Sequence, residues 1–181
     1  MDTELLLIEK DGFKFSRETK NHYKMNFSME NKKFDLTKII DFKLIKLIYD
    51  LNNDIYEKVD MNILNENEAI VTLLMKHFFE DLGLPQKFSY VHMKKILEER
   101  RIWFKSSSIK NIRPEGMPEE AELMKIQELI TICDIITPHN IQFSLNIIFD
   151  PNTYIPVFAE KMVGLILNKI FKRVKLFMEN I

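Results

Sequence analysis

The chain has 181 residues, of which 46% are hydrophobic and 29% charged, and its formal net charge at pH 7 is -1. A chain of this length can form one domain with a sizeable core, and its near-zero charge provides no overall attraction to nucleic acid. It has four glycines and contains none of the motifs GxGxxG, GxxxxGK[ST], HExxH, GxSxG or CxxC. We therefore expect no nucleic-acid partner and no cofactor.

Cys133 is the only cysteine, so no disulfide can form within the chain and a reducing compartment is expected. The first residues, MDTELLLIEK, combine an acidic start with a short apolar run, unlike a secretory signal. No apolar stretch approaches the length of a membrane span. We expect a cytoplasmic protein or a module of a larger intracellular one, with peripheral membrane association as a further expectation.

The N-terminal third predicts strands followed by a helix. Residues 5–8 and 13–16 are short extended pieces on either side of a Lys-Asp-Gly turn. In residues 22–30 the apolar side chains alternate strictly with polar ones, which predicts a strand with one buried face. A helix is expected from a cap at Asp35 or Thr37 to Leu51.

Two stretches allow two interpretations each. Residues 66–82 fit a helix with Gly83 as its terminator, but the same region fits a hairpin with strands over 56–64 and 69–79. Residues 88–97 fit a strand, whereas a helix over 89–101 is the competing interpretation. Local pattern alone does not decide between them.

Extended structure dominates the chain after residue 100. Residues 101–107 (RIWFKSS) predict a strand, and the prolines and glycine within 106–119 predict an ordered surface loop. The clearest hairpin has strands over 126–136 and 141–149 joined by Thr-Pro-His-Asn. On its second strand, Ile141, Phe143, Leu145, Ile147 and Phe149 share one face.

Residues 150–181 predict a long amphipathic helix. Pro156 suits its first turn because proline lacks the amide hydrogen that this turn leaves unpaired. The apolar stripe consists of Val163, Leu167, Ile170, Val174, Phe177 and Ile181. The basic side consists of Lys161, Lys169, Lys172, Arg173 and Lys175. That basic side fits either the solvated outer face of a core-covering helix or a membrane-surface helix.

These elements predict an α+β fold, in which a curved antiparallel sheet wraps its apolar face around the long C-terminal helix, with one further helix after the first strands. If sheet and helix do not touch along their whole length, the gap between them is an apolar cavity.

The order of elements resembles the START (steroidogenic-acute-regulatory-protein-related lipid transfer) family of the helix-grip superfamily, over about residues 5–179. NIIFDPNTYIP at 146–156 is similar to that family's last strand, its Asp-Pro-x-Gly turn and the Ile-Pro that opens the final helix. PQKFSYVHM at 85–93 is similar to its Arg-Asp-Phe-Val-Tyr-Val-Arg strand. The resemblance implies one START-like helix-grip domain over 1–181, with strands over 56–79 and 88–97.

The chain departs from the family pattern at several positions. The family's Arg-x-x-Trp-Asp after the first helix is absent, and Thr153 replaces the glycine of the turn. Gln86 and Lys87 replace its Arg-Asp pair, and His92 replaces its second arginine. Because that charge pair can meet a polar head group in family members, ligand identity does not carry over to this chain.

Few residues suggest chemistry. Glu128 and Asp134 share parity with isoleucines of the 126–136 strand, so they are either cavity carboxylates that bind a lipid hydroxyl or amine, or residues exposed at a bulge or strand end. The four histidines, His22, His77, His92 and His139, lack metal-ligand spacing, although His77 and His92 could approach across strands. We expect no metal site.

The remaining reactive side chains favour no catalytic reaction. Cys133 is expected to be a small sheet residue rather than a nucleophile, and the acidic pairs at 98–99 and 119–120 resemble surface runs. Lys94-Lys95 and Arg100-Arg101 lie near Trp103, where they fit phosphate or head-group contact or a solvated hairpin tip. No catalytic residue is nominated, so we expect no enzyme.

The favoured function is binding, and transfer between membranes, of a lipid or other apolar small molecule. The expected cavity lining is Tyr90, His92, Phe143, Leu145, Ile147, Met162, Val163, Ile166, Leu167 and Ile170. The loop 106–119 and the final helix would form the gate, as the resemblance implies. Membrane contact is expected from Lys169, Lys172, Arg173 and Lys175. The alternatives are a protein-interaction or accessory module with a filled core, and a cyclase- or hydrolase-type helix-grip enzyme.

Overall fold

The computed structural model describes residues 4–181, so residues 1–3 of the expected domain lie outside the described residues. Ten strands form one sheet in the order β1-β2-β3-β10-β9-β7-β6-β5-β4, and β8 pairs with β6. The strands are β1 Leu5–Lys10, β2 Phe13–Thr19, β3 His22–Glu30, β4 Tyr56–Asn65, β5 Glu68–Met75, β6 Lys87–Glu98, β7 Arg101–Ser108, β8 Glu122–Leu123, β9 Ile126–Thr137 and β10 Asn140–Phe149. All pairs are antiparallel except β6–β8.

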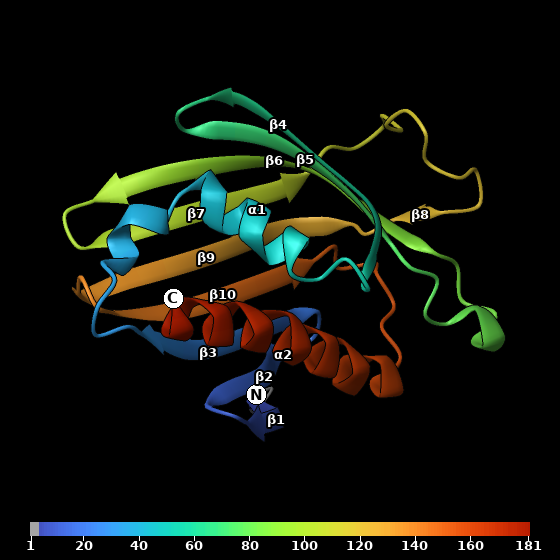
Figure 1. Ribbon diagram of the computed structural model, residues 1–181. Coiled ribbons are helices and arrows are strands. Elements are labelled where there is room, and N and C mark those ends of the chain that lie inside the picture. The colour runs from blue at the N-terminus through green and yellow to red at the C-terminus, as the bar shows by residue number, and fades with distance from the viewer. Residues whose placement is uncertain (1–3) are drawn as a thin grey trace.

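Two α-helices, α1 Phe42–Asp50 and α2 Val157–Asn180, lie on the same side of the curved sheet (Figure 1). We call this side the inner face and the opposite side the outer face. Two short 3-10 turns, η1 Leu36–Ile39 and η2 Glu80–Leu82, complete the described elements. The predicted α+β architecture, with a sheet gripping a long C-terminal helix, is confirmed.

The inner face carries the main core. Strand β3 buries every second residue from Tyr23 to Met29, as its alternation predicts. On β10, Ile141, Phe143 and Leu145 are likewise buried. The Phe27 ring stacks on Phe143 with centroids 5.0 Å apart, so the N-terminal strands and the final hairpin share one apolar layer.

Both ambiguous stretches are strands. Strands β4 and β5 pair in register with Met61 opposite Val71, and β6 occupies the second stretch, so the helices considered over 66–82 and 89–101 are wrong. Strand β5 buries Val71 on the inner face and packs Leu74 against Phe88 on the other. A strand buried on both faces has a nearly continuous apolar run, which explains its helix-like pattern. It ends at Met75, not at residue 79.

The first helix is shorter than predicted. The Asp35 carboxylate accepts a hydrogen bond from the Thr37 amide and caps only η1. Asp41, in an extended conformation, accepts a hydrogen bond of 2.6 Å from the Lys43 amide and starts α1. A second capping aspartate six residues after the first therefore divides the predicted helix into two pieces.

Helix α2 follows Pro156 as predicted, but its buried side is rotated toward β1 and β2. Gly164 is buried, and a β-carbon there would lie 2.6 Å from the Phe15 ring and 2.7 Å from Ile8. This close approach turns Met178 into the core. Phe177 and Ile181, predicted in the buried stripe, remain 42% and 45% exposed.

Candidate ligand site between the sheet and the C-terminal helix

The C-terminal half of α2 is sealed against the sheet. Ile170, Val174 and Met178 are at most 4% exposed. The Asn31 side chain donates a hydrogen bond of 2.7 Å to the Met178 carbonyl, and the Asn52 side chain donates one of 3.4 Å to the Ile170 carbonyl. Apolar packing and amide hydrogen bonds therefore hold this half of the helix in place.

In the N-terminal half of α2, Ala159, Gly164 and Asn168 are buried, but another side of the helix is less closely covered. Val163 and Leu167 pack against the main core but stay partly exposed, and Ile166 is also partly exposed. On the sheet, Leu129 and Thr131 are also partly exposed, although β9 is an interior strand with β10 and β7 on its two sides. Their exposure cannot come from a sheet edge. We call Leu129, Thr131, Val163, Ile166 and Leu167 the inner lining.

Ser106 borders this region, and Tyr49 contributes a second hydroxyl-bearing side chain to the inner face. Ser106 faces inward beside Phe104 and lies opposite Leu129 in the β7–β9 register. It is 4% exposed, and its Oγ has no hydrogen-bond partner among the described residues. Tyr49 packs against the same core from α1, with its ring edge-on to Tyr56. Burial raises the pKa of the Tyr49 hydroxyl, which keeps it neutral.

An ion pair lies at the first turn of α2. Glu160, only 4% exposed, accepts hydrogen bonds from Arg17 Nη1 at 2.9 and 3.1 Å and from the Tyr23 hydroxyl at 2.8 Å. Burial, and then the bond to Glu160, raises the pKa of Tyr23. The Glu160 carboxylate therefore has a cation and two donors, as a buried charge requires.

The four basic residues predicted to meet a membrane all have partners inside the molecule. Lys169 and Arg173 pair with Asp54 at the turn before β4. Lys172 lies 2.7 Å from Asp11. Lys175 donates to the Ser28 carbonyl at 2.5 Å and pairs with Glu179 at 3.0 Å. Hydrogen bonds from Arg173, then Lys169, lower the pKa of Asp54. The basic side of α2 thus attaches the helix to its neighbours.

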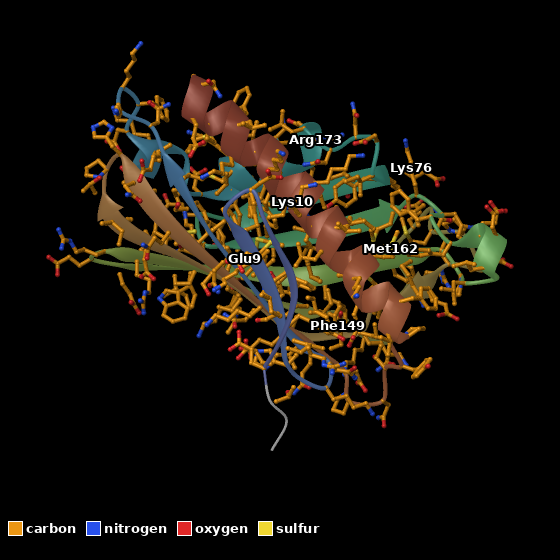
Figure 2. All side chains as sticks on the ribbon, turned by 90° about the horizontal axis from the view of Figure 1, so that it is seen from below. Glu9, Lys10, Lys76, Phe149, Met162 and Arg173 are labelled. Atoms are coloured by element: carbon orange, nitrogen blue, oxygen red, sulfur yellow. The ribbon has the colours of Figure 1, made fainter. Side chains whose placement is uncertain are left out.

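The predicted cavity residues are divided between the two faces of the sheet. Phe143, Leu145 and Ile147 are buried on the inner face, Ile170 lies in the sealed half of α2, and Met162 is 39% exposed. Figure 2 shows Met162 and Arg173 on the side of α2 away from Glu9 and Lys10. Val163, Ile166 and Leu167 belong to the inner lining.

Tyr90 and His92, in contrast, lie on the outer face. Val91 and Met93 alternate with them and pack in the main core, so both side chains point away from α2. Tyr90 packs with Phe88, Leu74, Met117 and Ala121. His92 lines an outer hollow of about 370 Å³ with Lys94, Lys105 and Glu128. The prediction that Tyr90 and His92 face the interior is wrong.

The loop 109–121 also packs on the outer face. Its Met117 contacts the cluster around Phe88. Arg113 donates hydrogen bonds to the carbonyls of Pro118, Glu119 and Ala121, and its guanidinium lies 5.2 Å from the centre of the Phe88 ring. The Arg113 side chain therefore holds this loop in a defined shape against the sheet.

Asp134 and Glu128 also lie on the outer face. Asp134 accepts a hydrogen bond of 2.5 Å from Arg101 Nε, whose guanidinium lies 5.2 Å from the Trp103 ring. The residues that β9 turns inward are Leu129, Thr131 and the fully buried Cys133. The hypothesis of a cavity carboxylate at these two positions is therefore wrong.

The reactive side chains are dispersed. Burial raises the pKa of the Cys133 thiol, in agreement with its predicted role as a small sheet residue. His77 bonds the Leu84 carbonyl after β5 has ended, whereas His92 pairs with Ile70 in mid-strand, so the two histidines do not meet. Residues 4–181 contain no group of three acidic, histidine or cysteine side chains that could hold a metal ion.

Sequence reasoning missed Ser106, Leu129, Thr131, Tyr49 and Glu160. The inward side of β9 could have been recognised from Leu129, Thr131, Cys133 and Ile135, an alternation with no charge in it. No comparable signal indicated Glu160, because an acidic residue in a first helical turn is ordinarily explained by the helix dipole.

No family model and no curated protein matches this chain. Several solved structures do match this chain. The lipid transfer and protein localization domain of human StarD13 (DLC2) matches with a TM-score of 0.72 at 9% identity, over 100% of this chain and 91% of that one. Human STARD10 matches with a TM-score of 0.70 at 10% identity, over 95% and 71%. A STAR-related lipid transfer protein from Xanthomonas axonopodis matches with a TM-score of 0.66 at 10% identity, over 98% and 99%. This chain therefore has the helix-grip fold of the StAR-related lipid transfer domains.

Proposed function

We propose that the protein binds a lipid or other apolar small molecule between the sheet and the N-terminal half of α2, and transfers it between membranes. One observation carries the proposal: inward side chains of an interior strand and of the helix above it remain partly exposed, whereas the β10 residues paired with Thr131 and Leu129, which are Leu145 and Ile147, are buried. Burial of apolar ligand surface against them would contribute about 25 cal/mol per Å². The fold shared with domains whose names describe lipid transfer supports the same function.

The proposal is tested by filling the site from the helix. Leu167→Trp places a large ring in the inner lining, whereas Leu176→Trp adds the same ring near the other end of α2, at a position 50% exposed. We expect L167W to abolish loading of a lipid seen by native mass spectrometry, and L176W to load like the wild type. Equal loading by both variants, or no loading of the wild-type protein from mixed liposomes, contradicts the proposal.

Membrane contact is proposed through the exposed apolar residues at the start of α2. These residues are Tyr154, Val157, Phe158, Met162 and Leu165. They make this half of the helix apolar even on its solvent side, as in helices that lie at a membrane surface. No helix among residues 4–181 is long and apolar enough to cross a membrane. Membrane contact through the four paired cations of α2 remains a secondary prediction, because reversing their charges would also break contacts within the molecule.

A matched pair of phenylalanines tests this membrane contact. Phe158, 50% exposed, lies in the apolar start of α2, and Phe177, 42% exposed, lies near its other end. We expect Phe158→Glu to reduce transfer from liposomes several-fold, because a carboxylate would have to enter the membrane interface, and Phe177→Glu to leave transfer unchanged. If F177E slows transfer as much as F158E, the contact is not at the start of α2.

We propose a non-catalytic, cytoplasmic role. The carboxylate in the first turn of α2, that of Glu160, already accepts hydrogen bonds from Arg17 and Tyr23. A cyclase- or hydrolase-type enzyme would need an acid–base pair facing the inner lining. A protein-interaction module would instead tolerate L167W without loss of function, since its surface would be unchanged.

A further inference from the structure

The inner lining contains only apolar and hydroxyl-bearing side chains. Leu129, Val163, Ile166 and Leu167 are apolar, and Thr131 contributes a hydroxyl. The polar group of Ser106, the cross-strand neighbour of Leu129, is a hydroxyl as well. Accordingly, this lining offers a ligand no charge of either sign.

The charged groups next to α2 have partners, and the Lys95 ammonium group, on the inner face of β6, lies 5.5 Å from the centre of the Phe42 ring. At one end of α2, Arg17 is paired with Glu160 and Tyr23 also donates to that carboxylate. On the side of the helix toward α1, Arg173 is paired with Asp54 and also donates to Asn52. A carboxylate or phosphate placed in the lining would compete with these pairs or stay unpaired, and an unpaired charge in an apolar site is costly.

Ser106 provides a polar atom beside the lining that makes no hydrogen bond to the described residues. Its Oγ is buried and unpartnered among the described residues, and its cross-strand neighbour Leu129 belongs to the lining. A buried hydroxyl without a partner loses free energy that a bound donor or acceptor restores. The neighbouring serine on the same strand, Ser107, pairs with His92 on the outer face, whereas Ser106 pairs with the buried Met93; both serines are among the residues that line the outer hollow.

We propose that the ligand is an uncharged lipid whose polar end consists of hydroxyl or carbonyl groups, and that one of these groups bonds Ser106 Oγ. Long-chain alcohols, sterols and monoacyl or diacyl glycerols have this chemistry, whereas ionised fatty acids and phospholipids do not. The inference rests on the proposed function, because it assigns a ligand class to the same site.

The test compares ligands of equal chain length in the full-length protein. A long-chain primary alcohol, the fatty acid of the same length at alkaline pH, and phosphatidylcholine are each offered to the wild type, Ser106→Ala, Ser106→Thr and Ser107→Ala. Affinity is measured by competition with a fluorescent apolar probe, and bound species are counted by native mass spectrometry.

We expect the alcohol to bind and the two charged lipids to bind at least tenfold more weakly. S106A should weaken binding of the alcohol about tenfold, which corresponds to the loss of one buried hydrogen bond. S106T and S107A should bind the alcohol as tightly as the wild type. S106A should also be no less stable than the wild type without ligand, because it removes an unsatisfied group.

Failure of this ligand assignment and failure of the proposed function give different results. If the fatty acid or phosphatidylcholine binds as tightly as the alcohol, or S106A binds the alcohol unchanged, this inference is overturned and the proposed function stands. If no lipid of the panel binds the wild type, the proposed function fails as well.

Discussion

Along α2, the contact between helix and sheet changes near Ile170. After that residue, Val174 and Met178 are completely buried, and before it Val163 and Leu167 stay partly exposed although they also pack on the core. The two halves differ in attachment too. Contacts with Asp54, Asp11 and Ser28 hold residues 169–175, whereas the cluster around Glu160 holds the first two turns.

This contrast separates stability from binding within one helix. The sealed half buries apolar surface that contributes to folding whether or not a ligand is present. The N-terminal half, which we call the open half, leaves apolar surface uncovered. This exposure lowers the stability of the free protein, and a ligand can cover the surface. Substitutions in the sealed half should therefore reduce stability, and substitutions in the open half should mainly alter ligand binding.

Two methionines of α2 provide the strongest test of this contrast. Met178 is completely buried and Met162 is 39% exposed. We expect Met178→Ala to lower the free energy of unfolding by about 2–5 kcal/mol, because it removes packed atoms and leaves a cavity. Met162→Ala should lower it by less than about 1 kcal/mol. Urea unfolding followed by circular dichroism measures both values.

Helix propensity does not distinguish the two variants, since each replaces methionine by alanine in the same helix. If M162A costs as much as M178A, the first half of α2 is packed as tightly as the second and the contrast is wrong. If neither costs more than about 1 kcal/mol, the sealed half does not stabilise the fold in the way proposed.

The sequence predicted best the elements that have one buried face. Strands β3 and β10 alternate strictly between apolar and polar side chains, so their limits and their inward residues were correct within one or two positions. Strand β5 was ambiguous because Val71 and Leu74 are both buried, on opposite faces. Periodicity carries no signal where both faces are covered.

The inward side of β6 was assigned incorrectly for a related reason. Phe88 and Tyr90 form an apolar alternation that resembles a core face, but the loop with Met117 covers them from outside. Which alternation faces the helix depends on the packing of a loop far along the chain. Sequence pattern likewise placed Phe177 in the buried stripe, because the close approach at Gly164 that rotates the helix is a tertiary contact.

The candidate site was predicted in part. Val163, Ile166 and Leu167 followed from the apolar stripe of the helix, and the inward residues of β10 followed from alternation. Ser106 and Thr131 did not, because polar residues in a strand are ordinarily assigned to the solvent side. They face inward since Phe104 and Cys133, at the same parity, are buried.

The contact of α2 with Asp54 gives the smallest expected effect and tests the sealed half through its ion pairs. Arg173 and Lys169 lower the pKa of Asp54 in the folded protein. A carboxyl group with a depressed folded pKa stabilises the protein above its unfolded pKa of about 3.9, and the contribution is lost as the pH falls toward the folded value. Because Asp54 is 42% exposed, we expect Asp54→Asn to cost about 1 kcal/mol or less at pH 7.

The difference in the free energy of unfolding between the wild type and D54N should shrink as the pH falls from about 5 toward 2.5. Urea unfolding at several pH values measures this difference. It should also shrink in high salt, because exposed charges are screened. Asp60→Asn, at an exposed position of β4, is the matched control and should show neither trend. A D54N deficit that is independent of pH would mean that the Asp54 side chain acts through hydrogen bonding that asparagine cannot reproduce, rather than through its charge, and the sealed half would then be held by geometry alone.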